Sequence, residues 1–247
     1  MSDSLERACC VASFDSDASN WRDVAAPLDP NWSYGLAFSG GCDSSFLLAA
    51  LMRAGIDVKA YMVLTAFQAE FELDDALRVV EETGAPFELI HADILTNREV
   101  CANPPDRCYH CKRFIFGTIL EAMRRDGRTV LLDGTNATDD PARRPGFRAL
   151  AELGVVSPLR DAGFTKDQVR AASRAIGLST ADKPSFSCFA TKVPAGAPIT
   201  QEALDEAHLL SECRAAADAA RGVDGVMRGA GRAGRWLSAA ALSARRR

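Results

Sequence analysis

The stretch Tyr34-Gly35-Leu36-Ala37-Phe38 runs directly into Ser39-Gly40-Gly41-Cys42-Asp43-Ser44-Ser45, and an apolar, helix-like stretch follows. Such a succession is typical of a β-strand, a tight loop and the start of a helix. Two glycines let backbone amides approach an anion closely, the serine hydroxyls add donors, and the helix N-terminus adds positive potential. The stretch predicts a phosphate-binding loop. The alternative is a glycine turn, capped by Asp43, that serves only the fold.

This loop differs from the two commonest nucleotide-binding loops. It lacks the lysine of a Walker loop and the third glycine of a dinucleotide fingerprint. Neither an ordinary nucleoside triphosphatase nor a Rossmann dehydrogenase is therefore the natural interpretation.

Beyond the loop, short apolar runs alternate with amphipathic stretches, which indicates βαβ units and a parallel sheet. We expect an α/β fold, a doubly wound parallel sheet of about five strands, with a short C-terminal helical appendage. The predicted strands are 34–39, 58–64, 87–92, 129–133 and 155–157. The predicted helices are 43–54, 73–82, 107–125, 142–153 and 166–176, the last with a capping box of Thr165 and Gln168.

The chain divides into three predicted parts. Residues 1–32 show no sustained period and are expected to be a loosely ordered lead-in. Residues 33–200 form the main domain, and 201–247 begin with a helix that runs to about Arg221 and end in a Gly-, Ala- and Arg-rich tail.

The amino-acid composition restricts the kinds of partner and the cellular compartment that we expect for this protein. The 247 residues are 47% hydrophobic, and 29 Lys and Arg against 33 Asp and Glu give a net charge of -4. No broad basic footprint predicts a nucleic-acid partner. The apolar runs are shorter than the roughly 18–20 residues of a membrane span, and the polar start lacks an export-signal pattern. We expect a protein of the reducing cytoplasm.

In reducing surroundings, cysteines cluster for metal binding or chemistry more often than for disulfides. Cys108-Tyr109-His110-Cys111 follows two prolines and Asp106, which predicts both thiols in the first turn of a helix. Their spacing puts the sulfurs on one face, and a helix N-terminus lowers a thiol pKa. The pair is presented as ligands or nucleophiles. The alternative is two half-buried small residues.

Two further stretches are candidates for the site. Asp133-Gly134-Thr135-Asn136-Ala137 follows the fourth predicted strand, where carboxyl ends of parallel strands line a binding crevice. Its alternative role is a turn that closes the strand. Cys188 lies in an irregular polar and aromatic segment, and alone it would be weak evidence, since free cysteines are usually core residues.

The pattern Ser-Gly-Gly-x-Asp-Ser after the first parallel strand resembles the signature of the PP-loop ATP pyrophosphatases, whose fold is adenine nucleotide alpha hydrolase-like. The resemblance implies cleavage of ATP to AMP and pyrophosphate, with the leaving pyrophosphate held by the loop. It also implies that Asp43 lies near Mg²⁺ and that residues 134–136 help to shape the cleft.

Further segments resemble the LarE branch of these enzymes, over roughly residues 34–200. They are Pro145-Gly146-Phe147-Arg148-Ala149, Ser157-Pro158-Leu159, Thr165-Lys166, Asp182-Lys183-Pro184-Ser185 and Cys188-Phe189-Ala190-Thr191-Lys192-Val193-Pro194. The resemblance implies a sulfur transferase that adenylates a carboxylate of a pyridinium dicarboxylate mononucleotide and converts it to a thiocarboxylate, for the nickel-pincer nucleotide cofactor. Sulfur would come from the position of Cys188.

The family has two versions of this chemistry. In one, the lone cysteine gives up its own sulfur and becomes dehydroalanine. In the other, three cysteines, which match Cys108, Cys111 and Cys188, hold a [4Fe-4S] cluster whose fourth iron can bind a sulfide. Because all three are present, we expect the cluster version, with sulfide or another sulfur donor as partner. Zinc, with His110 as a fourth ligand, is the competing metal.

The match weakens after the Thr200 region. The family continues there with a segment that contributes to phosphate binding and assembly, often into homo-oligomers, whereas this chain has a Gly-, Ala- and Arg-rich tail. Arg228, Arg232 and Arg235 could bind a phosphate there, but the favoured alternative is that they are solvated tail charges. Two other functions compete: a PP-loop tRNA thiolase, and a non-catalytic metal- or iron–sulfur-binding relative. The acidic balance counts against the first and the unaltered loop against the second.

Overall fold

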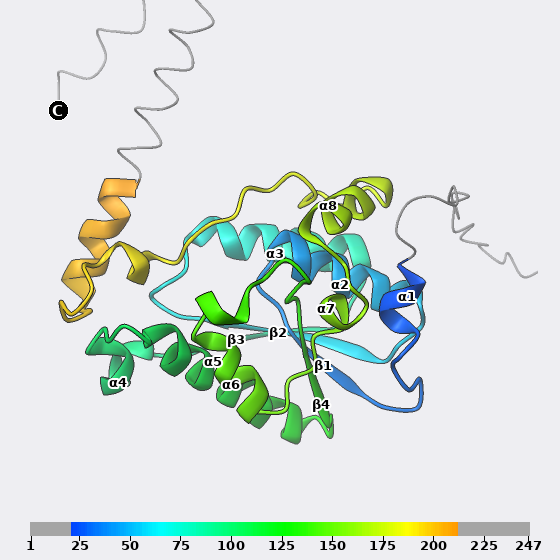
Figure 1. The fold of residues 1–247 in the computed structure, drawn as a ribbon, viewed down its shortest axis with the longest axis horizontal. Coiled ribbons are helices and arrows are strands. Elements are labelled where there is room, and N and C mark those ends of the chain that lie inside the picture. Colours follow the sequence, from blue (N-terminus) through cyan, green and yellow to red (C-terminus); the bar gives the residue numbers. More distant parts are fainter. Residues whose placement is uncertain (1–20, 212–247) are drawn as a thin grey trace, which may run out of the picture. The chain divides into compact units, whose positions relative to one another are not determined.

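The computed structural model describes residues 21–211 of the chain. A four-stranded sheet with the order β3-β2-β1-β4 forms its centre, and all neighbouring strands are parallel (Figure 1). The strands are β1 Tyr34–Ala37, β2 Val58–Leu64, β3 Phe87–His91 and β4 Val130–Asp133. Since parallel strands need crossover connections, each pair of successive strands is joined by at least one helix.

Strands β1, β2 and β4 are largely buried, whereas the edge strand β3 is only half-buried, and side chains along β2 and β4 alternate between two apolar cores. On β2, Ala60 and Met62 belong to one core, whereas Tyr61 and Val63 belong to the other. On β4, Leu132 and Leu131 divide in the same way. This near-continuous apolar character is typical of parallel strands covered by helices on both sides.

The helices cover the two faces as separate groups (Figure 1). One group contains α1 Arg22–Ala25, α2 Cys42–Arg53, α3 Glu70–Thr83, α7 Pro158–Asp161 and α8 Lys166–Ala175. The other contains α4 Arg98–Cys101, α5 Arg107–Arg125 and α6 Gly146–Glu152. Short 3-10 turns lie at η1 Ile94–Thr96, η2 Pro141–Arg143 and η3 Phe189–Lys192. The doubly wound α/β fold predicted from the sequence is confirmed.

The predicted fifth strand is reduced to a single parallel bridge between Leu132 and Val156. Val156 exchanges two backbone hydrogen bonds with β4, at 3.0 Å each, but Pro158 starts α7 two residues later. The chain therefore turns away before a strand can extend. The predicted capping box at α8 is present: Thr165 accepts from the Gln168 amide, and Gln168 accepts from the Thr165 amide.

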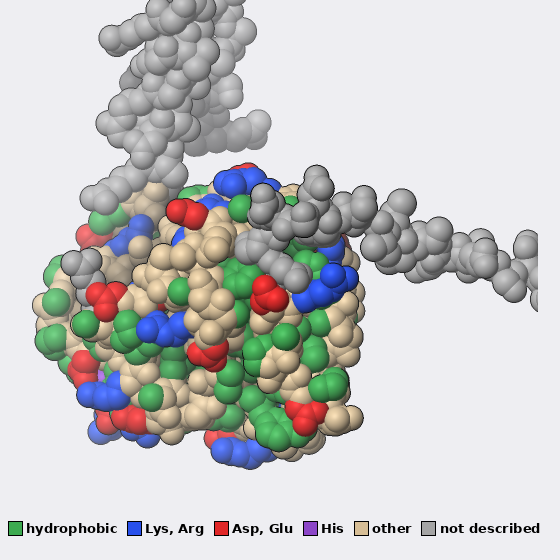
Figure 2. Space-filling model, turned by 45° about the vertical axis from the view of Figure 1, so that its right-hand side comes forward, with side chains coloured by type: hydrophobic (Ala, Val, Ile, Leu, Met, Phe, Trp, Pro, Cys, Tyr) green, Lys and Arg blue, Asp and Glu red, His purple; other side chains and the backbone are tan. Residues whose placement is uncertain are grey.

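Between Leu204 and Asp205 the described part of the chain divides into two units. Residues 201–211 are helical, whereas the predicted tail with Arg228, Arg232 and Arg235 lies outside the described residues. On the face shown in Figure 2, positive and negative side chains are interspersed. Within residues 21–211, no helix has the length and apolar character needed to cross a membrane.

Candidate active site

The predicted phosphate loop joins β1 to α2 and leaves the start of α2 open. Gly40 has a φ of 64°, and a Cβ on it would lie 2.8 Å from the Ala76 Cβ in α3, so glycine is required twice over. The Ser39 and Ser44 hydroxyls lie 3.1 Å apart across the loop. Gly41 is the N-cap of α2 and supplies no side-chain cap. The first amides of α2 are thus available to an anion.

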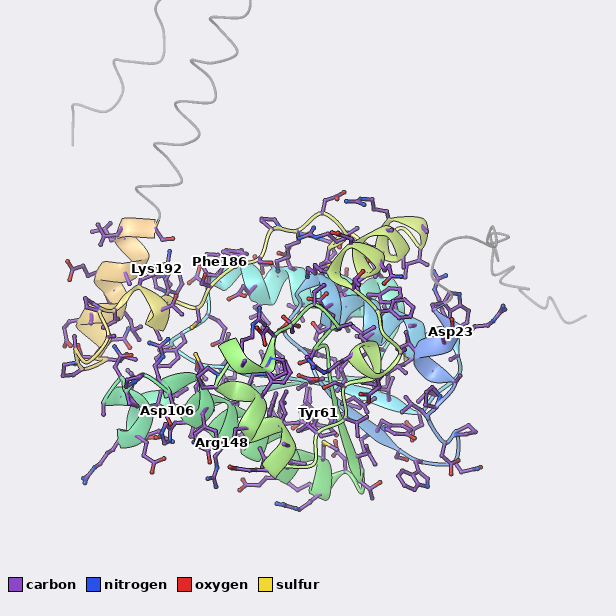
Figure 3. The ribbon with its side chains drawn as sticks, in the orientation of Figure 1. Asp23, Tyr61, Asp106, Arg148, Phe186 and Lys192 are labelled. Carbon is purple, nitrogen blue, oxygen red and sulfur yellow. The ribbon has the colours of Figure 1, made fainter. Side chains whose placement is uncertain are left out.

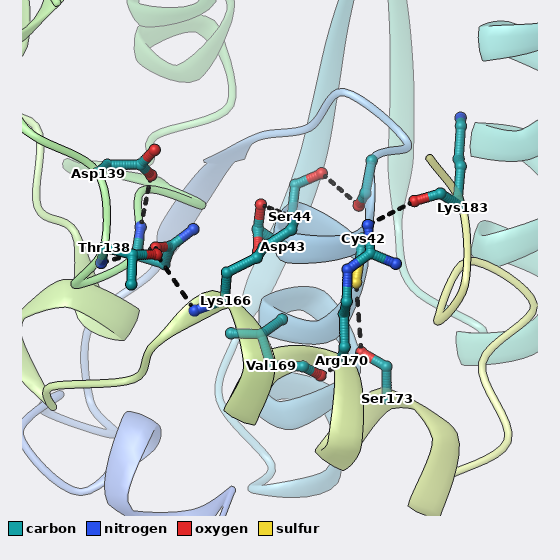
Figure 4. A network of polar contacts seen from close by, with 12 residues as sticks. Cys42, Asp43, Ser44, Thr138, Asp139, Lys166, Val169, Arg170, Ser173 and Lys183 are labelled. Carbon is teal, nitrogen blue, oxygen red and sulfur yellow. Dashed lines mark hydrogen bonds and ion pairs between the residues drawn. The ribbon is translucent and has the colours of Figure 1, made fainter. Parts of the chain in front are cut away.

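Asp43 does not cap this helix, which removes the purely structural role considered for it. Its Oδ2 accepts a hydrogen bond of 2.6 Å from Lys166 Nζ on α8 (Figure 4). Its Oδ1 is buried and has no hydrogen-bond partner in the described part of the chain. A buried carboxylate oxygen without a partner is costly, and a hard cation such as Mg²⁺ would satisfy it. The residues present therefore fit a magnesium ion at Asp43.

The second predicted motif packs directly onto the phosphate loop. A Cβ on Gly134 would lie 2.8 Å from the Ser44 amide nitrogen, so only glycine allows the two backbones to approach this closely. Asp133 precedes it at the end of β4, where its carboxylate accepts from the Thr135 and Ser157 hydroxyls, both at 2.6 Å. The motif thus forms one wall of the site rather than an isolated turn.

A cavity of about 670 Å³ lies over the loop. Of the predicted binding residues, its lining includes Ser39, Gly41, Asp43, Ser44, Gly134, Thr135 and Asn136. Gly40 and Ser45 do not line it, and the Ser45 hydroxyl is fully buried without a hydrogen-bond partner in the described residues. Ser45 is therefore not placed to donate to a ligand in this cavity.

Four cations line the same cavity, and sequence reasoning assigned a role to none of them: Lys112, Arg144, Lys166 and Lys183. Lys183 Nζ donates to the Gly40 carbonyl at 3.1 Å and pairs with Asp75 on α3 at 2.8 Å. Figure 4 shows Lys166 on α8 and Lys183 on a separate segment, where the Lys183 carbonyl accepts a hydrogen bond from Arg170. Both lysines belong to the segments that resemble LarE, which was the one available signal. Four carboxylates, those of Asp43, Glu72, Asp133 and Asp139, balance this charge in the lining, so its suitability for a phosphate rests on the open N-terminus of α2 with these lysines close to it.

Cys188 lies just before η3 and lines a second, mostly apolar cavity of about 220 Å³. Ser39, Glu72 and Phe186 line both cavities, so the two are adjacent. Phe186 and Lys192, labelled in Figure 3, lie on the segment that contains Cys188. The thiol is thus placed next to the phosphate loop.

Cys108 and Cys111 lie in the first turn of α5, as predicted, but the expected lowering of the thiol pKa is wrong for Cys111. Burial raises the pKa of Cys111 to about 12, and the neighbouring thiolates of Cys188 and Cys108 raise it further. Burial likewise raises the pKa of Cys188. For Cys111, desolvation therefore outweighs the effect of the α5 N-terminus.

A hydrogen bond of 2.7 Å from Arg107, beside Cys108, to the Ala190 carbonyl brings the Cys188 segment to the start of α5. Residues 21–211 contain no group of three or more His, Cys, Asp and Glu side chains arranged to hold a metal ion. His110, the proposed fourth ligand for zinc, contacts Glu99 through Nδ1 at 2.9 Å. The structure therefore does not support the predicted [4Fe-4S] cluster.

The other cysteines have separate surroundings. Cys42 is buried against Ser173 and the Ala181 carbonyl (Figure 4), and Cys101 Sγ contacts the Leu95 carbonyl at 3.3 Å. Cys9, Cys10 and Cys213 lie outside the described residues.

Known proteins resemble this chain over its main domain. No protein-family model matches it. An uncharacterised protein of Synechocystis is 33% identical over 170 residues, 68% of this chain and 63% of that protein. The pyridinium-3,5-bisthiocarboxylic acid mononucleotide synthase of Lactiplantibacillus plantarum, a LarE protein, is 31% identical over 169 residues, 68% of this chain and 61% of the synthase. The chain is a LarE-like member of the PP-loop superfamily.

This LarE-like chain spans less than two thirds of the length of those two relatives. A tRNA-specific 2-thiouridylase of Desulforamulus reducens is more distant, 27% identical over 199 residues, 62% of this chain and 54% of that enzyme. Among solved structures, the NH3-dependent NAD synthetase of Campylobacter jejuni aligns with a TM-score of 0.49 and 15% identity, over 68% of this chain and 80% of that chain.

Proposed function

We propose that the chain is an ATP-dependent sulfur transferase that converts a carboxylate of pyridinium-3,5-biscarboxylate mononucleotide to a thiocarboxylate. One observation carries the proposal. The Cys188 thiol lines a cavity that shares Ser39, Glu72 and Phe186 with the cation-lined cavity over the phosphate loop. A nucleotide in the larger cavity would lie beside a sulfur atom in the smaller one.

The first step is adenylation, to which the phosphate loop and its cations contribute. A carboxylate oxygen of the substrate attacks the α-phosphorus of ATP, an acyl adenylate forms, and pyrophosphate leaves. The amides at the start of α2 and the ammonium groups of Lys166 and Lys183 stabilise the negative charge of the leaving group. A Mg²⁺ ion at Asp43 would add positive charge there.

The second step transfers sulfur. The Cys188 thiolate attacks the acyl carbon of this mixed anhydride and AMP leaves, which gives a thioester. Removal of the Cys188 α-proton then breaks the Cβ–S bond, so the thiocarboxylate departs and dehydroalanine remains. If sulfide is the nucleophile instead, it displaces AMP directly and Cys188 is unchanged. The mostly apolar lining around Cys188 limits the water that could hydrolyse the adenylate. We derive no step through an iron–sulfur cluster. The iron content of the protein after anaerobic reconstitution tests whether Cys108, Cys111 and Cys188 can bind an iron–sulfur cluster.

The relatives support the substrate. The Lactiplantibacillus plantarum protein is named for the bisthiocarboxylic acid mononucleotide that it makes. The cavity of about 670 Å³ has room for a nucleotide. Its lining combines four cations with four carboxylates, so the open amides of α2 and a Mg²⁺ ion at Asp43 would hold the phosphates.

The test is incubation with Mg·ATP, the biscarboxylate mononucleotide and sulfide, followed by mass spectrometry of the products and of Cys188. We expect thiocarboxylate and AMP from the wild type, and pyrophosphate without thiocarboxylate from Cys188→Ser. Cys101→Ser is the matched control, since its thiol contacts the Leu95 carbonyl and lines neither cavity. Absence of thiocarboxylate from the wild type would refute the substrate, and dehydroalanine at Cys188 would identify that residue as the sulfur source.

A tRNA thiolase is the second candidate, favoured by the similarity to the 2-thiouridylase. That function requires pyrophosphate release from ATP that depends on tRNA and weakens as the salt concentration rises. Pyrophosphate release that depends on the mononucleotide and not on tRNA would exclude it.

A further inference from the structure

Asn103 joins the loop before α5 to the segment after Cys188. Its side-chain nitrogen donates to the Pro194 carbonyl at 2.9 Å and to the Ala197 carbonyl at 3.0 Å. Its backbone carbonyl accepts from the Gly196 amide at 3.1 Å. Asn103 is 2% exposed and is the one non-glycine residue with a positive φ, 50°, in the described part of the chain. Asparagine tolerates this backbone conformation better than most residues.

Arg107 extends these contacts toward the cysteines. Its Nη1 donates to Asn103 Oδ1 and to the Ala190 carbonyl, both at 2.7 Å. Arg107 immediately precedes Cys108, and Ala190 lies two residues after Cys188. Ala190 is fully buried, so its carbonyl has no access to water and depends on such a donor.

A separate contact fixes the other side of the Cys188 segment. The Phe189 amide donates to the Phe67 carbonyl, in the loop between β2 and α3, at 3.0 Å. Cys188 therefore precedes a short stretch that is tied to the phosphate-loop side through Phe189 and to the start of α5 through Ala190.

We propose that Asn103 and Arg107 form a clamp that sets the position of Cys188 relative to Cys108 and Cys111. They are positioning residues, and the importance of the position rests on the proposed sulfur transfer. The segment around Cys188 is irregular and has no β-ladder of its own, so these side-chain contacts replace one. Without them, the buried Ala190 carbonyl and the Pro194 and Ala197 carbonyls would lose these donors, and the segment could leave the start of α5.

The test measures how readily Cys188 meets Cys111. The folded protein is equilibrated with reduced and oxidised glutathione, and the Cys111–Cys188 disulfide is quantified by peptide mass spectrometry. Formation of the disulfide consumes one oxidised glutathione and releases two reduced ones, so its equilibrium constant reports how closely the protein holds the two thiols. No ATP or substrate is needed.

Three variants and one control follow from the contacts. Arg107→Met keeps an apolar stem and removes the donors, Arg107→Lys keeps the charge, and Asn103→Gly accepts the positive φ and removes only the amide. Arg113→Met is the matched control, because Arg113 lies on the same helix and contacts Tyr109 and Glu152 instead. We expect the equilibrium constant for the Cys111–Cys188 disulfide to fall about tenfold in Arg107→Met and Asn103→Gly, and to fall less in Arg107→Lys.

The clamp is refuted if the wild type forms no such disulfide. It is also refuted if the equilibrium constants of Arg107→Met and Asn103→Gly stay within about twofold of the wild-type value, or if that of Arg113→Met falls equally. Circular dichroism identifies any variant that fails to fold. If Arg107→Met does not fold, the equilibrium constants of Arg107→Lys and Asn103→Gly test the clamp instead. Failure of the wild type to make thiocarboxylate would remove the proposed function and leave this measurement unaffected.

Discussion

Replacing Gly134 with alanine should weaken ATP binding by displacing the start of α2. The new Cβ would lie 2.8 Å from the Ser44 nitrogen, 3.0 Å from the Ser44 Cα and 3.2 Å from the Asp43 carbonyl carbon. Ordinary contact needs about 3.5 Å, so the two backbones must separate by about 0.7 Å. Gly134 directly follows β4, and Ser44 lies in the first turn of α2, so both backbones are anchored by regular elements and neither can relax freely.

Two magnitudes follow for Gly134→Ala. Overpacking of this kind costs about 1–3 kcal/mol of unfolding free energy, with a fall in Tm of about 2–4 °C for each kcal/mol. The misplaced amides of the phosphate loop should lower the affinity for Mg·ATP by about tenfold or more. Urea unfolding measures the first effect, and titration calorimetry with Mg·ATP measures the second.

Gly117→Ala is the matched control for this prediction. Gly117 lies in α5 with open space around its Cβ position, so alanine should stabilise the protein by about 0.5–1 kcal/mol and leave ATP affinity unchanged. A folded Gly134→Ala protein that binds Mg·ATP within about twofold of the wild type would show that the close approach of the two motifs does not shape the site.

Lys166→Met removes the ion-pair partner of Asp43 at the surface of the site. We expect the free energy of unfolding to change by less than about 1 kcal/mol and the affinity for Mg·ATP to fall at least about tenfold. An unchanged affinity would contradict a role of Lys166 in ATP binding. Arg128→Met should lower stability without affecting ATP binding, because Arg128 donates to the Tyr34 carbonyl at 2.9 Å at the other end of the sheet. We expect the free energy of unfolding to fall by about 1–3 kcal/mol and calorimetry to find the same affinity for Mg·ATP. Burial raises the pKa of Glu72, so the folded state binds this proton more tightly than the unfolded state; its contribution to stability is present below the ordinary glutamate pKa and is lost as the pH rises through the raised value. Glu72→Gln should therefore have a higher Tm than the wild type at pH 7 and lose that advantage near about pH 4, and an advantage that grows with acidity would refute the assignment.

The local features of this protein are readable from its sequence. The glycine loop, the α5 bounds and the Thr165 capping box follow from patterns within a few residues, because turns, caps and helix periods are set by neighbouring side chains. The parallel α/β class follows from the alternation of such patterns. The LarE resemblance added a reason to look for Cys188 beside the loop.

Interactions between distant segments were decided only by the tertiary structure. Lys166 meets Asp43 across 123 positions, and Lys183 meets Gly40 across 143, and no local period encodes either contact. The direction of the Cys111 pKa shift also depends on folding, because burial of the thiol outweighs a helix N-terminus that the sequence alone indicates. The sequence by itself determined the phosphate loop and its place after β1. Tertiary packing determined which cations, which carboxylate and which thiol surround it, since those contacts exist only once distant helices pack against the same sheet.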